Sequence, residues 1–246
     1  MPIDAVIFDK DGVLLDLSQT WFLTICNIAK HTEELIDGRV PHRVLLDVIG
    51  VELNADGISG RVVENGAYAT GTYGSLVPMW SALDPALADI MTTTEYKQKM
   101  MDIAVQSVHG QTVPKGDILT PLRALKAAGY KLGVVTNDGD DTTAINMADL
   151  MLDDIMDHVV TADSGHGRKP DAGGIVACCA ALGTTPDRAV MIGDTYADHD
   201  AAIAAGCRHV IAITNDAPSI PDFMPKSSYA VASCADLPDL LARINS

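Results

Sequence analysis

Asp9 and Asp11 are two carboxylates separated by one residue, and they follow the apolar run Ala5-Val-Ile-Phe directly. Four apolar residues bounded by a turn at Gly12 are typical of a short, fully buried strand in a parallel sheet. Ligands of open α/β sheets bind outside the carboxyl ends of the strands, so both acids are expected at a binding site. Two adjacent anions raise each other's pKa unless a cation lies between them, so the pair indicates a hard divalent metal such as Mg²⁺. For an isolated pair, the alternative is a turn in which the aspartates cap loose backbone amides.

Other polar residues follow later apolar runs that are also predicted to be strands. The predicted strands cover residues 131–136 and 189–193, and a helix is expected over 171–182. The polar residues at the strand ends, and in the loop before that helix, are Thr136, Asn137, Lys169, Asp194 and Asp198.

The elements around these residues predict an α/β fold with an insertion. From residue 114 onward helical and strand patterns alternate, which predicts a parallel sheet with right-handed crossovers. Before residue 130 only helical patterns are evident after the first strand; the first of these helices is expected from Ser18, as its N-cap, to about Ile36. We therefore expect a core domain over 1–17 and 116–246 and an inserted, mostly helical cap domain over 18–115.

Composition limits the classes of partner and the compartment. The chain has 246 residues, 48% of them apolar, and a formal charge of −16. This charge argues against nucleic acid and anionic membrane surfaces as partners. No apolar run reaches membrane-spanning length and no signal sequence is evident, so a cytoplasmic location is expected. The five scattered cysteines lack zinc-site spacing and are expected to be reduced and mostly buried.

The order of these pieces resembles the haloacid dehalogenase-like hydrolase superfamily over nearly the whole chain. The pieces are Asp-x-Asp-Gly at residues 9–12, a Thr at a strand end, Lys-Pro at 169–170 and Gly-Asp-x-x-x-Asp at 193–198. Segments 116–136 and 198–206 are similar to its phosphoglycolate phosphatase branch, which has a helical cap. The resemblance implies a Rossmann-like parallel sheet with helices on both faces. It also implies a phosphatase acting on a small phosphorylated metabolite.

The resemblance implies roles for the first two acids in phosphoryl transfer. Asp9 would attack phosphorus and form an aspartyl-phosphate. Asp11 would protonate the leaving oxygen and then deprotonate the water that hydrolyses the intermediate. Mg²⁺ would be held by Asp9, the main-chain carbonyl of Asp11 and Asp194, while Asp198 would orient the metal-bound waters.

Three further residues are implied to bind phosphoryl oxygens. Thr136 through its hydroxyl and Asn137 through its amide would donate hydrogen bonds, and Lys169 would supply positive charge. The lysine loop departs from the common Lys-Pro-x-Pro form, and an alignment on Pro-Asp would put Gly167 in the place of the lysine. Asp138 also stands where the phosphoglycolate branch usually has Lys, which weakens the substrate assignment.

Two other activities use similar residues. A β-phosphoglucomutase-type transfer uses the same four motifs and differs chiefly in the cap. A phospho-aspartate signalling module also uses strand-end acids, Mg²⁺, Thr and Lys, but it is about half as long and lacks the insertion. Haloacid dehalogenases lack the second aspartate, so Asp11 favours phosphate esters.

The substrate would be selected by the cap. A basic cap residue facing the site would favour a substrate with a second anion, and phosphoglycolate fits this requirement. The basic candidates in the cap are Arg39, Arg43, Arg61, Lys97 and Lys99.

Overall fold

The chain divides into two compact units. A computed structural model describes residues 2–63, 66–71, 73–214, 220–222 and 224–246. The core unit comprises Met1–Asp16 and Pro114–Ser246, and the insert unit comprises Leu17–Val113. The insert unit therefore interrupts the core unit once, after its first strand.

The core unit is built on a six-stranded parallel sheet with the strand order β5-β4-β1-β6-β7-β8. These strands are β1 (Ala5–Phe8), β4 (Lys131–Val135), β5 (His158–Val160), β6 (Ala189–Gly193), β7 (His209–Ile213) and β8 (Tyr229–Val231). Strand β1 lies between β4 and β6, and all four of its residues are buried. Its uninterrupted apolar sequence is what a strand covered on both faces requires.

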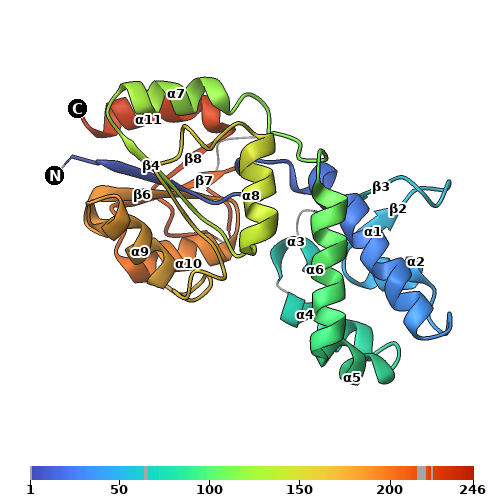
Figure 1. Cartoon of the computed structure of the whole chain (residues 1–246). Coiled ribbons are helices and arrows are strands. Elements are labelled where there is room, and N and C mark those ends of the chain that lie inside the picture. Colours follow the sequence, from blue (N-terminus) through green and yellow to red (C-terminus); the bar gives the residue numbers. More distant parts are fainter. Residues whose placement is uncertain (1, 64–65, 72, 215–219, 223) are drawn as a thin grey trace. The chain divides into compact units, whose positions relative to one another are not determined.

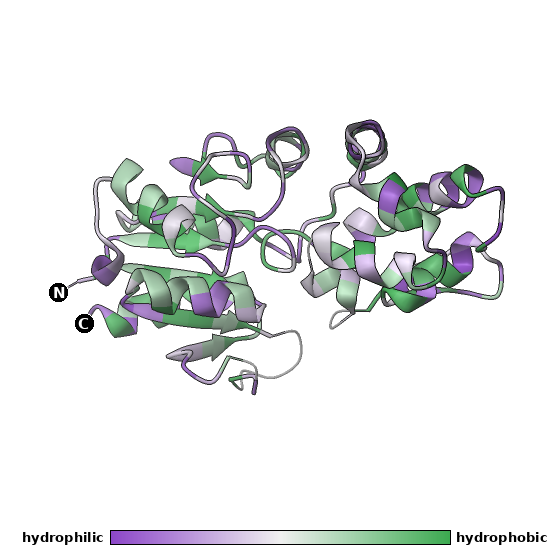
Figure 2. Cartoon of the chain, turned by 90° about the horizontal axis from the view of Figure 1, so that it is seen from below, coloured by the Kyte–Doolittle hydropathy of each residue, from purple (hydrophilic) through white to green (hydrophobic). Residues whose placement is uncertain are grey.

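Helices cover both faces of this sheet, which confirms the predicted Rossmann-like fold class. They are α7 (Leu119–Ala127), α8 (Asp140–Asp149), α9 (Gly173–Ala181), α10 (Tyr196–Ala205) and α11 (Leu237–Ile244), with short 3-10 turns at Pro186–Arg188 and Cys234–Asp236. Helices α7 and α11 lie over one face and α9 and α10 over the other (Figure 1). The strands between them are largely hydrophobic (Figure 2). The core of this unit therefore lies in two layers, one on each side of the sheet.

The insert unit is mostly helical and has its own hydrophobic core. Its helices are α1 (Leu17–Leu35), α2 (His42–Val48), α3 (Ala67–Thr70), α4 (Tyr73–Ser81), α5 (Ala86–Thr92) and α6 (Thr94–Val108). Trp80 is buried at its centre and donates its indole N–H to the carbonyl of Leu45 at 2.9 Å. Among the described residues, none of the helices combines the length and apolar character needed to cross a membrane.

Two sequence expectations for the insert unit were wrong. It contains an antiparallel pair of strands, β2 (Val51–Leu53) and β3 (Gly60–Val62), which are too short for alternation to reveal. Ser18 is not an N-cap, because α1 begins at Leu17 and the Ser18 hydroxyl accepts a hydrogen bond from the backbone N–H of Val62 at 2.9 Å. The serine therefore joins α1 to the strand pair that the sequence did not indicate.

Candidate active site

Three adjacent strands of the core unit end at the candidate site. Asp9 follows β1, Thr136 follows β4 and Asp194 follows β6. The register pairs Phe8 of β1 with Val134 of β4 and with Ile192 of β6, so the three strands end side by side. The strand order changes direction at β1, because the chain adds β4 and β5 on one side of it and then β6, β7 and β8 on the other. Such switch points are the usual ligand sites of open α/β sheets.

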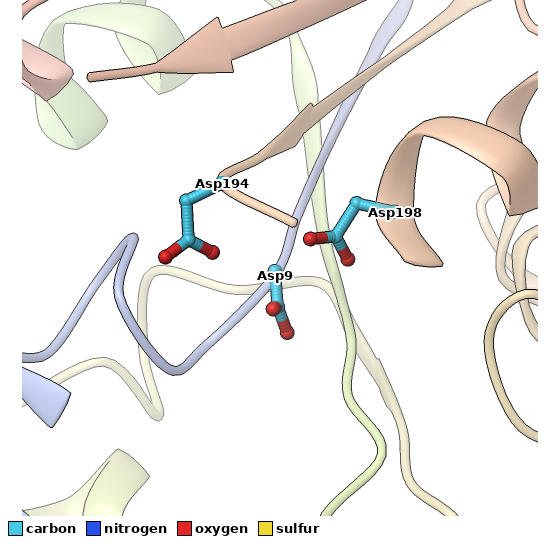
Figure 3. A group of neighbouring side chains, drawn as sticks. All are labelled: Asp9, Asp194 and Asp198. Atoms are coloured by element: carbon cyan, nitrogen blue, oxygen red, sulfur yellow. The ribbon is translucent and has the colours of Figure 1, made fainter. Parts of the chain in front are cut away.

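Asp9, Asp194 and Asp198 form an acidic triad at these strand ends. One carboxylate oxygen from each residue lies within 4.8 Å of the other two. The three side chains converge from β1, from the end of β6 and from the first turn of α10 (Figure 3). Within the described part of the chain, the buried Oδ1 atom of Asp194 has no hydrogen-bond partner. A cluster of carboxylate oxygens with an unsatisfied buried member fits a hard divalent cation such as Mg²⁺.

The two oxygens of Asp198 are already engaged. Its Oδ2 accepts from the backbone N–H of Thr195 at 3.1 Å and from the Thr195 hydroxyl at 2.7 Å, as part of the capping box that begins α10. Its Oδ1 accepts from Nζ of Lys169 at 2.6 Å. These contacts leave Asp194 and Asp9 as the members of the triad that are better suited to contact a metal directly.

Lys169 lies among these acids, with its Nζ 2.6 Å from Oδ1 of Asp9 and 2.6 Å from Oδ1 of Asp198. The lysine is only 6% exposed, so its charge is compensated by carboxylates rather than by water. Of the two alignments of this loop, the one that uses Lys169 brings a cation to the acids, whereas Gly167 has no side chain to offer.

Asn137 holds the Lys169 segment in place through its side chain. Its Nδ2 donates to the carbonyl of Lys169 at 2.9 Å, and its Oδ1 accepts from the Lys169 backbone N–H at 2.7 Å. Sequence reasoning assigned the amide of Asn137 to a phosphoryl oxygen and did not indicate these side-chain contacts. The neighbouring Thr136 is buried, and its hydroxyl accepts from the backbone N–H of Asp138 at 3.1 Å, so its own hydrogen can be donated to another acceptor.

The triad lies in an environment that opposes negative charge. Burial, and then the charge of Asp198, raise the pKa of Asp9, while Lys169 lowers it in part. The pKa of Asp194 is raised for the same reasons, burial first and then the charges of Asp198 and Asp9. Burial alone would lower the pKa of Lys169, but the carboxylates of Asp198 and Asp9 raise it above its ordinary value. Bound Mg²⁺ would relieve the same repulsion between the carboxylates.

Asp11 is near the triad but does not belong to it. Its carboxylate Oδ2 lies 2.9 Å from Nζ of Lys10, and its side chain is 23% exposed. Lys10 is fully buried between the two aspartates of the first motif. Sequence reasoning missed this lysine, because a lysine next to a turn is usually exposed and nothing in its sequence position indicates burial.

Lys115 is a second cation that sequence reasoning missed. Its Nζ donates to the carbonyl of Gly12, and its charge lowers the pKa of Asp194 against the larger effect of burial. Gly12 itself has φ +77°, and its turn lies directly against the Asp194 carboxylate. Lys115 therefore links the start of the second core segment to the turn of the first motif.

A family model described as haloacid dehalogenase-like hydrolase matches residues 3–206. The chain belongs to the haloacid dehalogenase-like hydrolases. Pyrophosphatase PpaX of Listeria monocytogenes serotype 4a is 32% identical over 202 residues, which are 81% of this chain and 78% of the relative. Phosphoglycolate phosphatase of Thiobacillus denitrificans is 28% identical over 208 residues, 84% of this chain and 82% of the relative.

The crystal structure of a β-phosphoglucomutase from Clostridium difficile has the same fold as this haloacid dehalogenase-like hydrolase. The TM-score is 0.65 at 17% identity, covering 99% of this chain and 96% of that one. The predictions of this family and of a phosphatase are confirmed by the family match and by the names of the curated relatives.

Proposed function

We propose that this haloacid dehalogenase-like hydrolase is a Mg²⁺-dependent phosphatase that acts on a small phosphorylated metabolite through an aspartyl-phosphate on Asp9. The observation that carries the proposal is the acidic triad with Lys169 bridging two of its members. Phosphoryl transfer needs neutralised oxygens and in-line positioning rather than elaborate covalent chemistry. A buried cluster that combines carboxylates for a metal with a fixed cation meets both needs.

In the proposed reaction, a carboxylate oxygen of Asp9 attacks phosphorus while the bond to the leaving oxygen breaks. Asp11 gives its proton to that oxygen and afterwards takes a proton from the water that attacks the phospho-aspartate. Thr136 and the main-chain amide of Asn137 donate to the phosphoryl oxygens, and Lys169 adds positive charge.

The metal would be held by Asp9, Asp194 and the main-chain carbonyl of Asp11, with Asp198 holding its waters. When bound, Mg²⁺ supplies charge neutralisation for the phosphoryl oxygens. The engagement of both oxygens of Asp198 by Thr195 and Lys169 supports an indirect role for that residue.

The test is phosphate release from p-nitrophenyl phosphate and a panel of metabolites, with Mg²⁺ and with EDTA. We expect turnover that requires Mg²⁺ and disappears in Asp9→Asn, because an amide is no nucleophile and is a weaker metal ligand. Asp153→Asn, at an exposed acid of the core unit, is the matched control and should retain wild-type rates. Absence of metal-dependent turnover on every substrate would reject the proposal. A phospho-protein that forms but does not turn over would indicate the signalling alternative.

We propose further that the substrate carries a second anion, with phosphoglycolate as the first candidate. Relatives named phosphoglycolate phosphatase and pyrophosphatase support this class, since both named substrates have a second anionic group. Among the basic candidates of the insert unit, Arg39 is paired with Asp84 at 2.6 Å and Arg61 with Glu52 at 2.8 Å. The exposed candidates on α2 and α6, which are better able to meet a substrate, are Arg43, Lys97 and Lys99.

A ranking of kcat/KM for phosphoglycolate, pyrophosphate, sugar phosphates and nucleotides tests this assignment. Phosphoglycolate should be preferred by at least about tenfold, about 1.4 kcal/mol, which is what one modest specific contact provides. A tenfold preference for pyrophosphate would make pyrophosphate the favoured substrate in place of phosphoglycolate, still within the class of substrates that carry a second anion. Formation of glucose 6-phosphate from β-glucose 1-phosphate would instead favour the mutase alternative.

We also propose that the insert unit is a mobile lid that excludes water during the reaction. The chain enters and leaves it once each, at Asp16–Leu17 and at Val113–Pro114. Small-angle scattering with and without beryllium fluoride, which mimics the phosphoryl group, should report a more compact molecule when the mimic and Mg²⁺ are bound. An unchanged radius of gyration would contradict the lid.

A further inference from the structure

Lys10 lies between the two catalytic aspartates of the first motif and has no exposed surface. Its Nζ donates to Oδ1 of Asn146 at 2.7 Å and lies 2.9 Å from Oδ2 of Asp11 and 3.1 Å from Oδ2 of Asp138. The ammonium group is therefore surrounded by two carboxylates and one amide oxygen, and all three of its donors have an acceptor in reach.

These three partners come from separate parts of the core unit. Asp11 belongs to the turn after β1, Asp138 to the loop after β4, and Asn146 to the buried face of α8. The lysine backbone is fixed as well, because its carbonyl accepts from the N–H groups of Leu14 and Leu15 at 2.9 and 3.1 Å. Lys10 thus links the carboxylate of Asp11 to the loop after β4 and to α8.

Burying a lysine side chain costs free energy, because its charge loses its contact with water. An apolar side chain of similar length would fill the same volume without desolvating a charge, and buried ion pairs often add little to stability. The better supported role of a buried ion pair is to fix the geometry of the side chains that form it. Asp11 is the group that must place a proton on the leaving oxygen and then collect one from water, and a small misplacement of such a group costs much of the rate.

We propose that Lys10 is a positioning residue for Asp11, holding its carboxylate in the orientation that proton transfer requires. The proposal rests on the proposed function, in which Asp11 is the general acid and base. Lys10 has no part in binding substrate or metal in this arrangement. Its loss should therefore lower kcat and leave KM nearly unchanged.

The test uses Lys10→Met, in which the side chain keeps a similar length and loses the ammonium group. The side chain of Asp11 is 23% exposed, so water can solvate this carboxylate when the lysine is absent. We expect kcat to fall by about 10- to 100-fold with KM within about twofold of wild type. The matched control is Lys126→Met, which removes another Lys–Asp pair of the core unit, to Asp157. Asp157 directly precedes β5, so this pair lies at the amino ends of the strands and not at the carboxyl ends that form the site. It should leave both constants unchanged.

A double-mutant cycle with Asp11→Asn separates positioning from general structural damage. In the Asp11→Asn background, Lys10→Met should change kcat by less than about threefold, because the group that it positions no longer transfers protons. An equal loss of kcat in both backgrounds, a raised KM with unchanged kcat, or no effect at all would overturn the proposal. If wild type itself lacks Mg²⁺-dependent phosphatase activity, the proposed function fails instead.

If circular dichroism shows that Lys10→Met does not fold, Asn146→Ala is the second variant to test. This variant removes the amide anchor of Lys10 and keeps every charge of the cluster. We expect a smaller loss of kcat, about three- to tenfold, that again disappears in the Asp11→Asn background. Equal losses in the two backgrounds would overturn the proposal here too.

Discussion

A methyl group added to Gly12 would lie 1.9 Å from Oδ2 of Asp194. Gly12 also has φ +77°, a backbone conformation that favours glycine. The glycine of the first motif is therefore required twice, once by its own turn and once by the carboxylate that follows β6. The first and last motifs are in direct contact here, although more than 180 residues separate them.

Gly12→Ala should displace the Asp194 carboxylate and lower both Mg²⁺ affinity and turnover, the latter by at least about 100-fold because a metal ligand is misplaced. Gly206→Ala is the matched control, since Gly206 has φ +79° and no atom within 4 Å of an added methyl group. The control should lose about 1–2 kcal/mol of unfolding free energy through backbone strain alone and keep its activity. Equal activity in the two variants would contradict the contact. Denaturant unfolding and steady-state kinetics provide both measurements.

Mg²⁺ binding should strengthen as the pH rises. Burial, and then the charge of Asp198, raise the pKa of Asp9 from its ordinary value to about 7, and Lys169 opposes this rise only in part. In the metal-free folded protein this group therefore holds a proton between about pH 4 and 7 that the unfolded chain has lost, so it contributes stability that falls as pH rises through that window. Metal binding must expel the proton, so it is opposed at low pH.

The measurement is the rise in Tm that saturating Mg²⁺ produces at several pH values. The rise should be larger at about pH 8 than at about pH 5.5, and Asp194→Asn should reduce it at both. A rise in Tm that does not depend on pH would show that the carboxylates are ionised before the metal arrives.

Lys169→Met should lower kcat by at least about 100-fold, because the developing charge on phosphorus loses its fixed cation and two carboxylates 2.6 Å from Nζ lose their partner. Lys126→Met serves as the control, because the partner of Lys126 is a surface carboxylate, Asp157. If Lys169→Met retained more than a tenth of the wild-type kcat, the assignment of Lys169 to the phosphoryl group would be wrong.

Lys115→Met should lower the free energy of unfolding, and the loss should be larger when Mg²⁺ is absent. Its Nζ bonds to the Gly12 carbonyl, and its charge favours the ionised form of Asp194. We expect a loss of about 1–2 kcal/mol of unfolding free energy in EDTA, as for a charged hydrogen bond, and a smaller loss with saturating Mg²⁺, because the metal replaces the missing charge. Equal losses with and without metal would contradict that electrostatic role. Denaturant titrations in the two buffers decide between these outcomes.

The strand ends of the core unit were predictable because each buried strand is a continuous apolar run. Strand β1 and the acids after it follow directly from that pattern, as do β4 and β6. The strands of the insert unit were harder to predict. β2 and β3 have only three residues each, and a period of two cannot be recognised over so short a length. The hydroxyl of Ser18 was misread for the same reason, because its partner lies on β3.

The contacts within the site were the least predictable part. Lys10 and Lys115 are ordinary lysines in the sequence, and their partners are brought together only by the pairing of β1 with β4 and by the return of the chain at Pro114. The side chain of Asn137 forms hydrogen bonds with the Lys169 backbone, and nothing in the sequence indicates these contacts. Spacing along the chain indicates which side chains lie at a strand end, but it does not indicate which residues they contact there.

The position of β1 in the sheet has a consequence for synthesis on the ribosome. Residues 5–8 are among the first to emerge, yet their partners are residues 131–134 and 189–192. The insert unit, by contrast, is continuous in sequence and has its own core, so it is complete before either partner strand of β1 exists. The apolar segment that becomes the centre of the sheet therefore has no partner strand while about half of the chain is translated. During that interval it is a natural binding segment for a chaperone.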